Sequence, residues 1–156
     1  MATRSTIALE YADGTVDQVY CHWDGYLEHN GKILFEHYVS PFKVQQLMDL
    51  GDISSLGQDV GEKHDFSRLD SPLPADEYER LYGHMVTFYG RDRGEEGTER
   101  KRFADFADYK KNHQYEEYEY ILRRDGNWYV SAYGKEYVLL KDAIAKEAAE
   151  LEAEDA

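Results

Sequence analysis

The side chains that could do chemistry are concentrated in residues 20–26, which we call the aromatic block. The block combines a thiol, an imidazole, an indole, a carboxylate and two phenols. Its residues are Tyr20, Cys21, His22, Trp23, Asp24, Gly25 and Tyr26. It lies where a predicted strand ends and a loop begins, and loops at strand ends often display binding residues on a rigid scaffold. The aromatic block is therefore the first candidate for a functional site.

Catalysis at the block would need a nucleophile beside a base. Adjacent residues of a strand point to opposite faces, so Cys21 and His22 share no hydrogen bond unless the strand breaks between them. The nucleophile motif Gly-x-Ser-x-Gly is absent from the sequence. We therefore predict that Cys21 packs in the core, and we assign no catalytic residue.

Four side chains in and after the block could bind a metal ion: those of His22, Asp24, His29 and His37. Imidazole and carboxylate groups are suitable ligands for zinc or iron. Their spacing matches no defined motif, and a helix over residues 32–39 can turn His37 away from the others. We predict no metal ligands and no cofactor, and a metal-dependent enzyme stays as a third hypothesis.

The block also has groups that a nucleotide site requires. Trp23 and Tyr26 offer rings on which a base can stack, and Asp24 can accept hydrogen bonds from a base or ribose. Cations for the phosphates are densest in the mixed-charge segment 90–102. The candidate ligand-binding residues are His22, Trp23, Asp24, Tyr26, Arg91 and Arg93. The alternative is that the two rings only anchor the loop to the core.

The composition restricts the partners. Among 156 residues, 32 are acidic and 18 are basic, which gives a net charge of −14. Direct binding of DNA or RNA needs an excess of cations, and anionic membranes repel acidic proteins, so we expect neither partner. The partners that fit are a protein with a cationic surface or a small nucleotide. The oligomeric state does not follow from the composition.

The single cysteine and the N-terminus indicate the location. Cys21 cannot form an internal disulfide, as is typical of proteins in a reducing cytoplasm. The sequence begins with no signal-peptide pattern, and no apolar run approaches the roughly 20 residues of a membrane-spanning helix. We expect a cytoplasmic protein.

Two hairpins frame the predicted sheet. Residues 7–11 and 16–21 read as strands around Asp13 and Gly14, a dipeptide typical of a two-residue type I′ turn. The second hairpin pairs residues 118–122 with residues 128–133.

Two further strands and several helices complete the pattern. A middle strand is predicted at 85–89 and a short edge strand at 136–139. The predicted helices cover residues 32–39, 41–50, 76–82 and a C-terminal stretch from Leu140 whose acidic end, 150–155, frays. Residues 52–75 are predicted to be a long irregular loop, and residues 90–102 a solvated one. Phe103, Phe106 and Tyr109 suit either a helical turn or a loop that packs its rings on the core.

These elements predict an α+β fold in a single domain, residues 1–156. The predicted sheet is antiparallel and is built from an N-terminal and a C-terminal β-hairpin plus the middle strand. The helices are predicted to cover one face.

Several segments resemble a family of small uncharacterised proteins encoded by tailed phages and prophages. The resemblance rests on residues 3–7 (TRSTI), the aromatic block, the LGD and SSL motifs at residues 50–56, and the strand at 128–133 with the helix after it. Many relatives carry Pro where Leu27 stands here. The resemblance implies a phage setting and the host cytoplasm, and it implies no reaction.

The leading hypothesis is a non-enzymatic phage accessory protein that binds and inhibits or redirects a host factor. An acidic protein of this kind can occupy a cationic groove on an anti-phage defence or nucleic-acid-processing protein. The second hypothesis is a nucleotide-binding sponge that uses the aromatic block and nearby cations.

Overall fold

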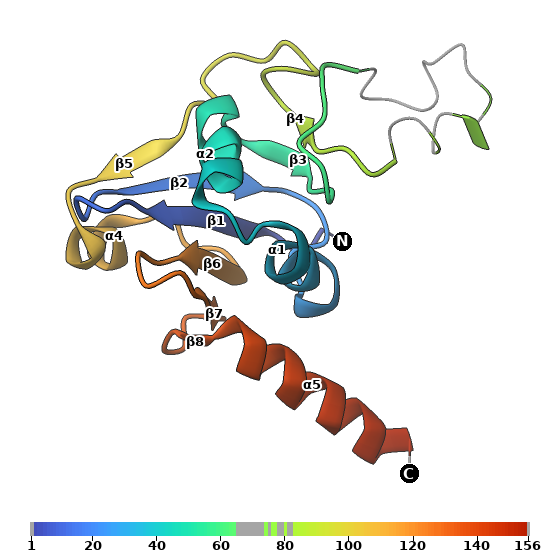
Figure 1. Cartoon of the computed structure of the whole chain (residues 1–156), viewed down its shortest axis with the longest axis vertical. Coiled ribbons are helices and arrows are strands. Elements are labelled where there is room, and N and C mark those ends of the chain that lie inside the picture. The colour runs from blue at the N-terminus through green and yellow to red at the C-terminus, as the bar shows by residue number, and fades with distance from the viewer. Residues whose placement is uncertain (1, 65–73, 75, 78–79, 81–82, 156) are drawn as a thin grey trace.

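The computed structural model describes residues 2–64, 74, 76–77, 80 and 83–155. Within these residues the strands are β1 (Ser5–Glu10), β2 (Val16–Cys21), β3 (Ile53–Ser55), β4 (Thr87–Phe88), β5 (Lys101–Phe103), β6 (Tyr118–Leu122), β7 (Trp128–Ala132) and β8 (Val138–Leu139). The helices are a π-helix, η1 (Leu27–Gly31), and α1 (Lys32–His37), α2 (Pro41–Leu50), α4 (Phe106–Asn112) and α5 (Leu140–Asp155). These strands form one sheet in the order β4-β3-β2-β1-β6-β7-β8, with β5 also paired to β2 (Figure 1). The predicted α+β class is confirmed.

The first hairpin has a different turn from the one predicted. β1 and β2 pair antiparallel, but the Tyr11 N–H donates to the Thr15 carbonyl at 2.8 Å, which leaves residues 12–14 as the loop. Gly14 has a φ of 94°, whereas Asp13 is not among the residues with positive φ. A type I′ turn needs positive φ at both central residues, so the predicted turn type is wrong.

A parallel pair joins the two hairpins. β6 and β7 pair antiparallel as predicted, but β1 pairs with β6 in parallel, Ser5 opposite Tyr118. β2 and β3 are also parallel, with Cys21 opposite Ile53. The sheet is therefore mixed, and the prediction of a wholly antiparallel sheet is wrong.

Helices lie on both faces of this sheet. Ile7 and Leu9 of β1 pack in the larger core with residues of α1 and α2, while Ala8 between them packs with Tyr109 of α4 in a second, smaller cluster. Successive residues of a strand point to opposite faces, so α4 covers the face that the other helices leave open. The prediction that the helices share one face is therefore wrong. Of the three rings at 103–109, Phe106 and Tyr109 lie in α4, whereas Phe103 ends β5.

The middle of the chain contains more regular structure than predicted. The described part of the loop at 52–75 includes β3, and the predicted middle strand is present as β4, which pairs with it. Asp92 is buried and Lys101–Phe103 form β5, so the segment 90–102 is not a solvated loop throughout. The helix predicted at 76–82 falls largely outside the described residues.

The C-terminal helix leaves the body of the protein. Leu140 is fully buried in the larger core, whereas residues 148–154 are exposed, and α5 extends past the sheet (Figure 1). The short edge strand predicted before it is present as β8. Among the helices in the described part of the chain, none is long and apolar enough to cross a membrane.

Candidate functional site

The aromatic block begins with a buried thiol. Cys21 ends β2 with no exposed surface, and the Asn30 side chain donates to its sulfur at 3.4 Å and to the Trp23 carbonyl at 3.3 Å. Burial raises the pKa of the Cys21 thiol to about 11. The thiol is therefore protonated at neutral pH, which agrees with the predicted packing role.

The backbone of the block is tied to its surroundings. The N–H groups of His22 and Trp23 donate to carbonyls of β3, both at 3.0 Å, and the Gly25 N–H donates to Thr3 at 2.8 Å. The Gly25 carbonyl accepts the Tyr120 hydroxyl at 2.6 Å. A Cβ at Gly25 would lie 2.9 Å from the Thr3 carbonyl oxygen, so glycine is needed here for close packing.

Two rings of the block still face outward. Trp23 is 46% exposed and Tyr26 is 40% exposed. The His22 ring lies edge-on to Trp23 at 4.8 Å, and its Nδ1 is 2.7 Å from the Tyr20 hydroxyl. Asp24 has a φ of 57°, an αL conformation, and is partly buried. The block is thus anchored through its backbone and displays Trp23 and Tyr26 at the surface.

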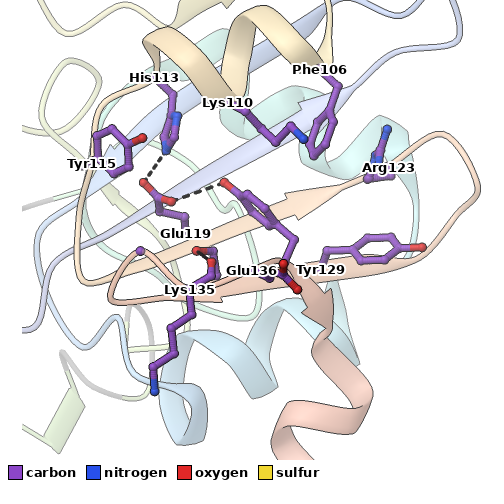
Figure 2. A pocket seen from close by; sticks show the side chains of 12 residues that line it. Phe106, Lys110, His113, Tyr115, Glu119, Arg123, Tyr129, Lys135 and Glu136 are labelled. Atoms are coloured by element: carbon purple, nitrogen blue, oxygen red, sulfur yellow. Dashed lines mark hydrogen bonds and ion pairs between the residues drawn. The ribbon is translucent and has the colours of Figure 1, made fainter.

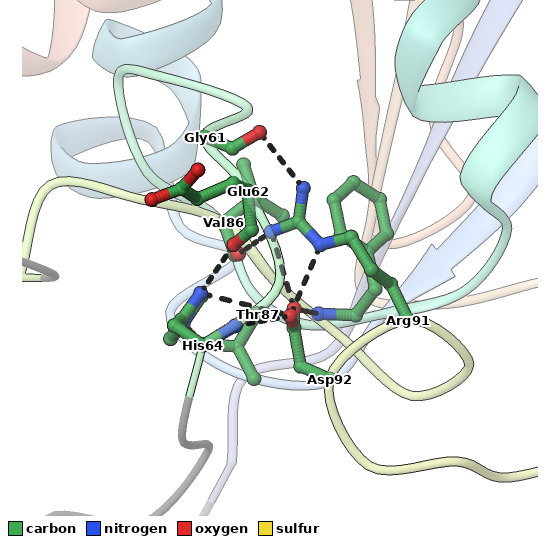
Figure 3. A network of polar contacts seen from close by, with 8 residues as sticks. Gly61, Glu62, His64, Val86, Thr87, Arg91 and Asp92 are labelled. Atoms are coloured by element: carbon green, nitrogen blue, oxygen red, sulfur yellow. Dashed lines mark hydrogen bonds and ion pairs between the residues drawn. The ribbon is translucent and has the colours of Figure 1, made fainter.

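The predicted cation Arg91 belongs to a separate set of polar contacts, which we call the Arg91 network (Figure 3). Its guanidinium donates to the carbonyls of Gly61 at 3.1 Å and Val86 at 2.8 Å, and to the Asp92 carboxylate at 3.0 Å. These acceptors occupy most of its donors. Arg91 therefore fixes two segments of chain to each other.

Asp92 is the centre of the Arg91 network. Besides Arg91, its fully buried carboxylate accepts the backbone N–H groups of His64 at 3.1 Å and Phe88 at 2.8 Å. Two of its partners are main-chain groups, so the network ties residues 61–64 to β4 and the residue before it.

Arg93, unlike Arg91, is connected to the aromatic block by a short chain of contacts. It stacks over the Tyr89 ring at 5.1 Å and pairs with Glu95 at 3.1 Å. Tyr89 hydrogen-bonds to Ser54, whose carbonyl accepts the Trp23 N–H. The structure thus links Arg93 to the block through β3, while Arg91 points into its own network.

The described residues include no group of three or more His, Cys, Asp or Glu side chains placed to hold a metal ion. The four side chains considered from the sequence are all described. His22 contacts Tyr20, and His29 contacts Asn30 at 2.9 Å.

A cavity that the sequence did not suggest lies beside α4, and we call it the α4 cavity. Its volume is about 500 Å³. It lies on the face of β6 and β7 that α4 partly covers, and the segment 134–137 forms its other wall. Its lining residues are Phe106, Lys110, His113, Tyr115, Glu119, Arg123, Tyr129, Ser131, Gly134, Lys135, Glu136 and Tyr137.

A buried His–Glu pair lies in the wall of the α4 cavity (Figure 2). The Nε2 atom of His113 is 2.6 Å from Glu119 Oε1, and its Nδ1 is 2.6 Å from the Tyr109 carbonyl oxygen. The Tyr137 hydroxyl is 3.3 Å from the other Glu119 oxygen and 3.1 Å from the Tyr109 hydroxyl. Of these contacts, only the one to the Tyr109 carbonyl involves the main chain, and the others join side chains.

The hydrogen-bond acceptors around His113 favour its protonated form. A carbonyl only accepts, so Nδ1 carries a proton, and a carboxylate at Nε2 favours a second one. Burial alone lowers the pKa of His113, but the hydrogen bond and charge of Glu119 outweigh it, and the pKa is raised. When His113 is protonated, its charge and that of Glu119 cancel inside the wall.

A second hollow, the α5 groove, lies between α5 and the β7–β8 end of the sheet, with a volume of about 600 Å³. Its apolar lining residues are Leu27, Tyr118, Val130, Ala132, Tyr133, Val138 and Ala143. Its acidic lining residues are Glu136, Asp142, Glu147 and Glu150, and its basic ones are Lys135 and Lys146. The lining therefore combines apolar side chains, which we call its floor, with charged side chains, which we call its rim and in which four carboxylates outnumber two lysines.

One signal in the sequence could have revealed the α4 cavity. Glu119 alternates with tyrosines, a pattern typical of a strand with one solvent-facing side, but Ile121 belongs to the same series as Glu119. An isoleucine there indicates that this face is covered too. Tyr109 and His113, four residues apart on one helix, are the partners that cover it.

No family model matches the chain, and neither the curated proteins nor the solved structures include a match to it.

Proposed function

We propose that this chain is a non-enzymatic phage accessory protein that binds a host protein through the α5 groove. The observation that carries the proposal is the combination of an apolar floor with four carboxylates on its rim. A basic segment with one or two apolar side chains complements both parts of such a surface. Inhibition or redirection of a host defence or nucleic-acid-processing factor would follow from occupying its cationic surface.

The charges on the rim support a cationic partner. Burial, and then the nearby carboxylates of Glu28 and Glu150, raise the pKa of Glu147. These acids repel one another in the unbound protein. A lysine or arginine of a partner would relieve that repulsion, and the net charge of −14 would steer it toward the groove.

Exposed apolar groups beside the groove support a protein partner in particular. Val138 on its floor is 49% exposed, and Leu151 on the projecting part of α5 is 43% exposed. The projecting helix extends the contact surface beyond the groove itself. The phage setting rests on the resemblance of the sequence segments described above.

The proposal is tested by purifying tagged protein from infected cells and comparing two double variants. Glu147→Gln with Glu150→Gln removes two rim charges, and Glu152→Gln with Glu154→Gln removes two exposed charges of the same helix outside the groove. We expect the first pair to reduce capture of a host protein by about tenfold or more and the second to change it little.

Salt provides the second arm of the test. Capture by the unmodified protein should fall steeply between low and high ionic strength, because screening weakens charge-dominated binding. Equal capture by both double variants, or capture that salt does not change, would contradict the proposal.

A further inference from the structure

The α4 cavity is a locally cationic site in an acidic protein. Lys110, Arg123 and Lys135 line it, and its lining carboxylates are Glu119 and Glu136. Glu119 is already hydrogen-bonded to His113 and Tyr137, and the three cations outnumber the two lining carboxylates. This balance is the reverse of the overall charge of −14.

Two of these cations differ in how strongly they are already occupied. Arg123 donates to both oxygens of Glu10, at 3.1 and 3.2 Å, and lies 3.7 Å from the centroid of the Phe106 ring. Lys110 lies 5.0 Å from that centroid and has no carboxylate within 4.0 Å among the described side chains. Figure 2 shows Lys110 extending from α4 to the Phe106 ring. Its ammonium is available to an anion.

Aromatic faces lie in the same cavity. Tyr115 packs on the His113 ring at 4.3 Å and is 64% exposed. Tyr129 also lines the cavity. A ring that enters the site can stack on Tyr115 while an anionic group reaches Lys110.

We infer that the α4 cavity binds a nucleoside monophosphate, with its base at Tyr115 and its phosphate at Lys110. The size of the cavity falls within the range of about 300–1,000 Å³ that is usual for small-molecule sites. This assignment differs from the nucleotide site predicted at the aromatic block. The two hollows share Lys135 and Glu136 in their linings, but neither Lys110 nor Tyr115 lines the α5 groove, so variants of these two residues test the α4 cavity separately.

Isothermal titration calorimetry with AMP tests the site, and adjacent lysines of α4 provide a matched pair of variants. Lys110→Gln should weaken AMP binding by about tenfold or more, because a charge-assisted hydrogen bond is lost. Lys111→Gln, at an exposed position outside the cavity, should leave the affinity within about twofold. Tyr115→Ala should weaken AMP without changing the weak binding of ribose 5-phosphate.

Three results would overturn the inference. One is the absence of AMP binding at millimolar concentration, and another is an equal effect of Lys110→Gln and Lys111→Gln. The third is ribose 5-phosphate binding as tightly as AMP, which would remove the role of the ring. Circular dichroism of each variant checks that it is folded, and loss of structure in Tyr115→Ala would leave the lysine pair as the deciding measurement.

Discussion

The Arg91 network and the wall of the α4 cavity use the same residue types in two different ways. Each contains a buried carboxylate beside a histidine, Asp92 with His64 and Glu119 with His113. Asp92 accepts main-chain N–H groups from two segments, whereas Glu119 contacts only side chains. The first carboxylate therefore fixes the position of the backbone, while the second contributes to the charge of a cavity wall.

The largest effect should come from breaking the backbone-tied network. Asp92→Ala removes the acceptor of two buried N–H groups and leaves the Arg91 guanidinium without its counter-charge. We expect a loss of about 3–5 kcal/mol in the free energy of unfolding, measured by chemical denaturation. Glu95→Gln, which alters only the exposed pair with Arg93, should cost less than about 1 kcal/mol. Similar losses in the two variants would refute the distinction.

Breaking the side-chain network should cost less and should change the response to pH. Glu119→Gln removes a charged hydrogen bond, and we expect a loss of about 1.5–3 kcal/mol near pH 6.

The sign of the pH effect follows from the raised pKa of His113. Its stabilisation is complete below the pKa of about 6.5 in the unfolded chain and is lost as the pH rises through the higher folded value. The unmodified protein should therefore lose stability across this window, and Glu119→Gln should lose less. Unfolding curves at several pH values measure this, and parallel pH profiles would contradict it.

The aromatic block gives a further comparison, since it is also tied through its backbone. Gly25→Ala places a methyl group 2.7 Å from the Ser5 Cβ and close to a carbonyl oxygen. We expect a loss of about 1–3 kcal/mol, measured as a lower denaturation midpoint. No measurable loss would show that the block tolerates movement and is not an anchor.

The smallest effect is expected at the exposed ring of the same block. Trp23→Ala should cost less than about 1 kcal/mol, because almost half of the side chain already contacts solvent. A larger loss would assign Trp23 itself, and not only its backbone, to the anchor. Thermal unfolding of this variant beside Gly25→Ala separates the two roles of the block.

Local chemistry explains which elements could be predicted. The start of α2 follows from Pro41 at the first helical position, while the side chain of Ser40, the N-cap residue, makes no capping hydrogen bond. The hairpins follow from alternation around Asp-Gly turns. The dipeptide of Asp13 and Gly14 does not determine the turn type, because it suits hairpin loops of different length. The parallel pairing of β1 with β6 depends on segments far apart in the chain, and no local pattern specifies it.

The sites were harder to predict than the elements. The aromatic block was recognised by residue type, yet its backbone contacts with Thr3, β3 and Tyr120 depend on the fold. Glu119 reads as an exposed strand residue until α4 is placed over it. Arg91 was predicted to be a candidate ligand because it sits in a charged segment, and its carbonyl partners come from residues 61 and 86.

The parallel junction of β1 and β6 also has a consequence for folding. Glu10 and Arg123, which pair at the end of this junction, are 113 positions apart in the chain. Contacts between residues so far apart in the chain form slowly, because a long loop must close before they contribute stability. During synthesis on the ribosome, the edge of β1 that pairs with β6 stays unpaired until β6 has been made. An unpaired strand edge can pair with strands of other chains. Fragments that end before residue 118 should therefore aggregate, although they contain the whole first hairpin.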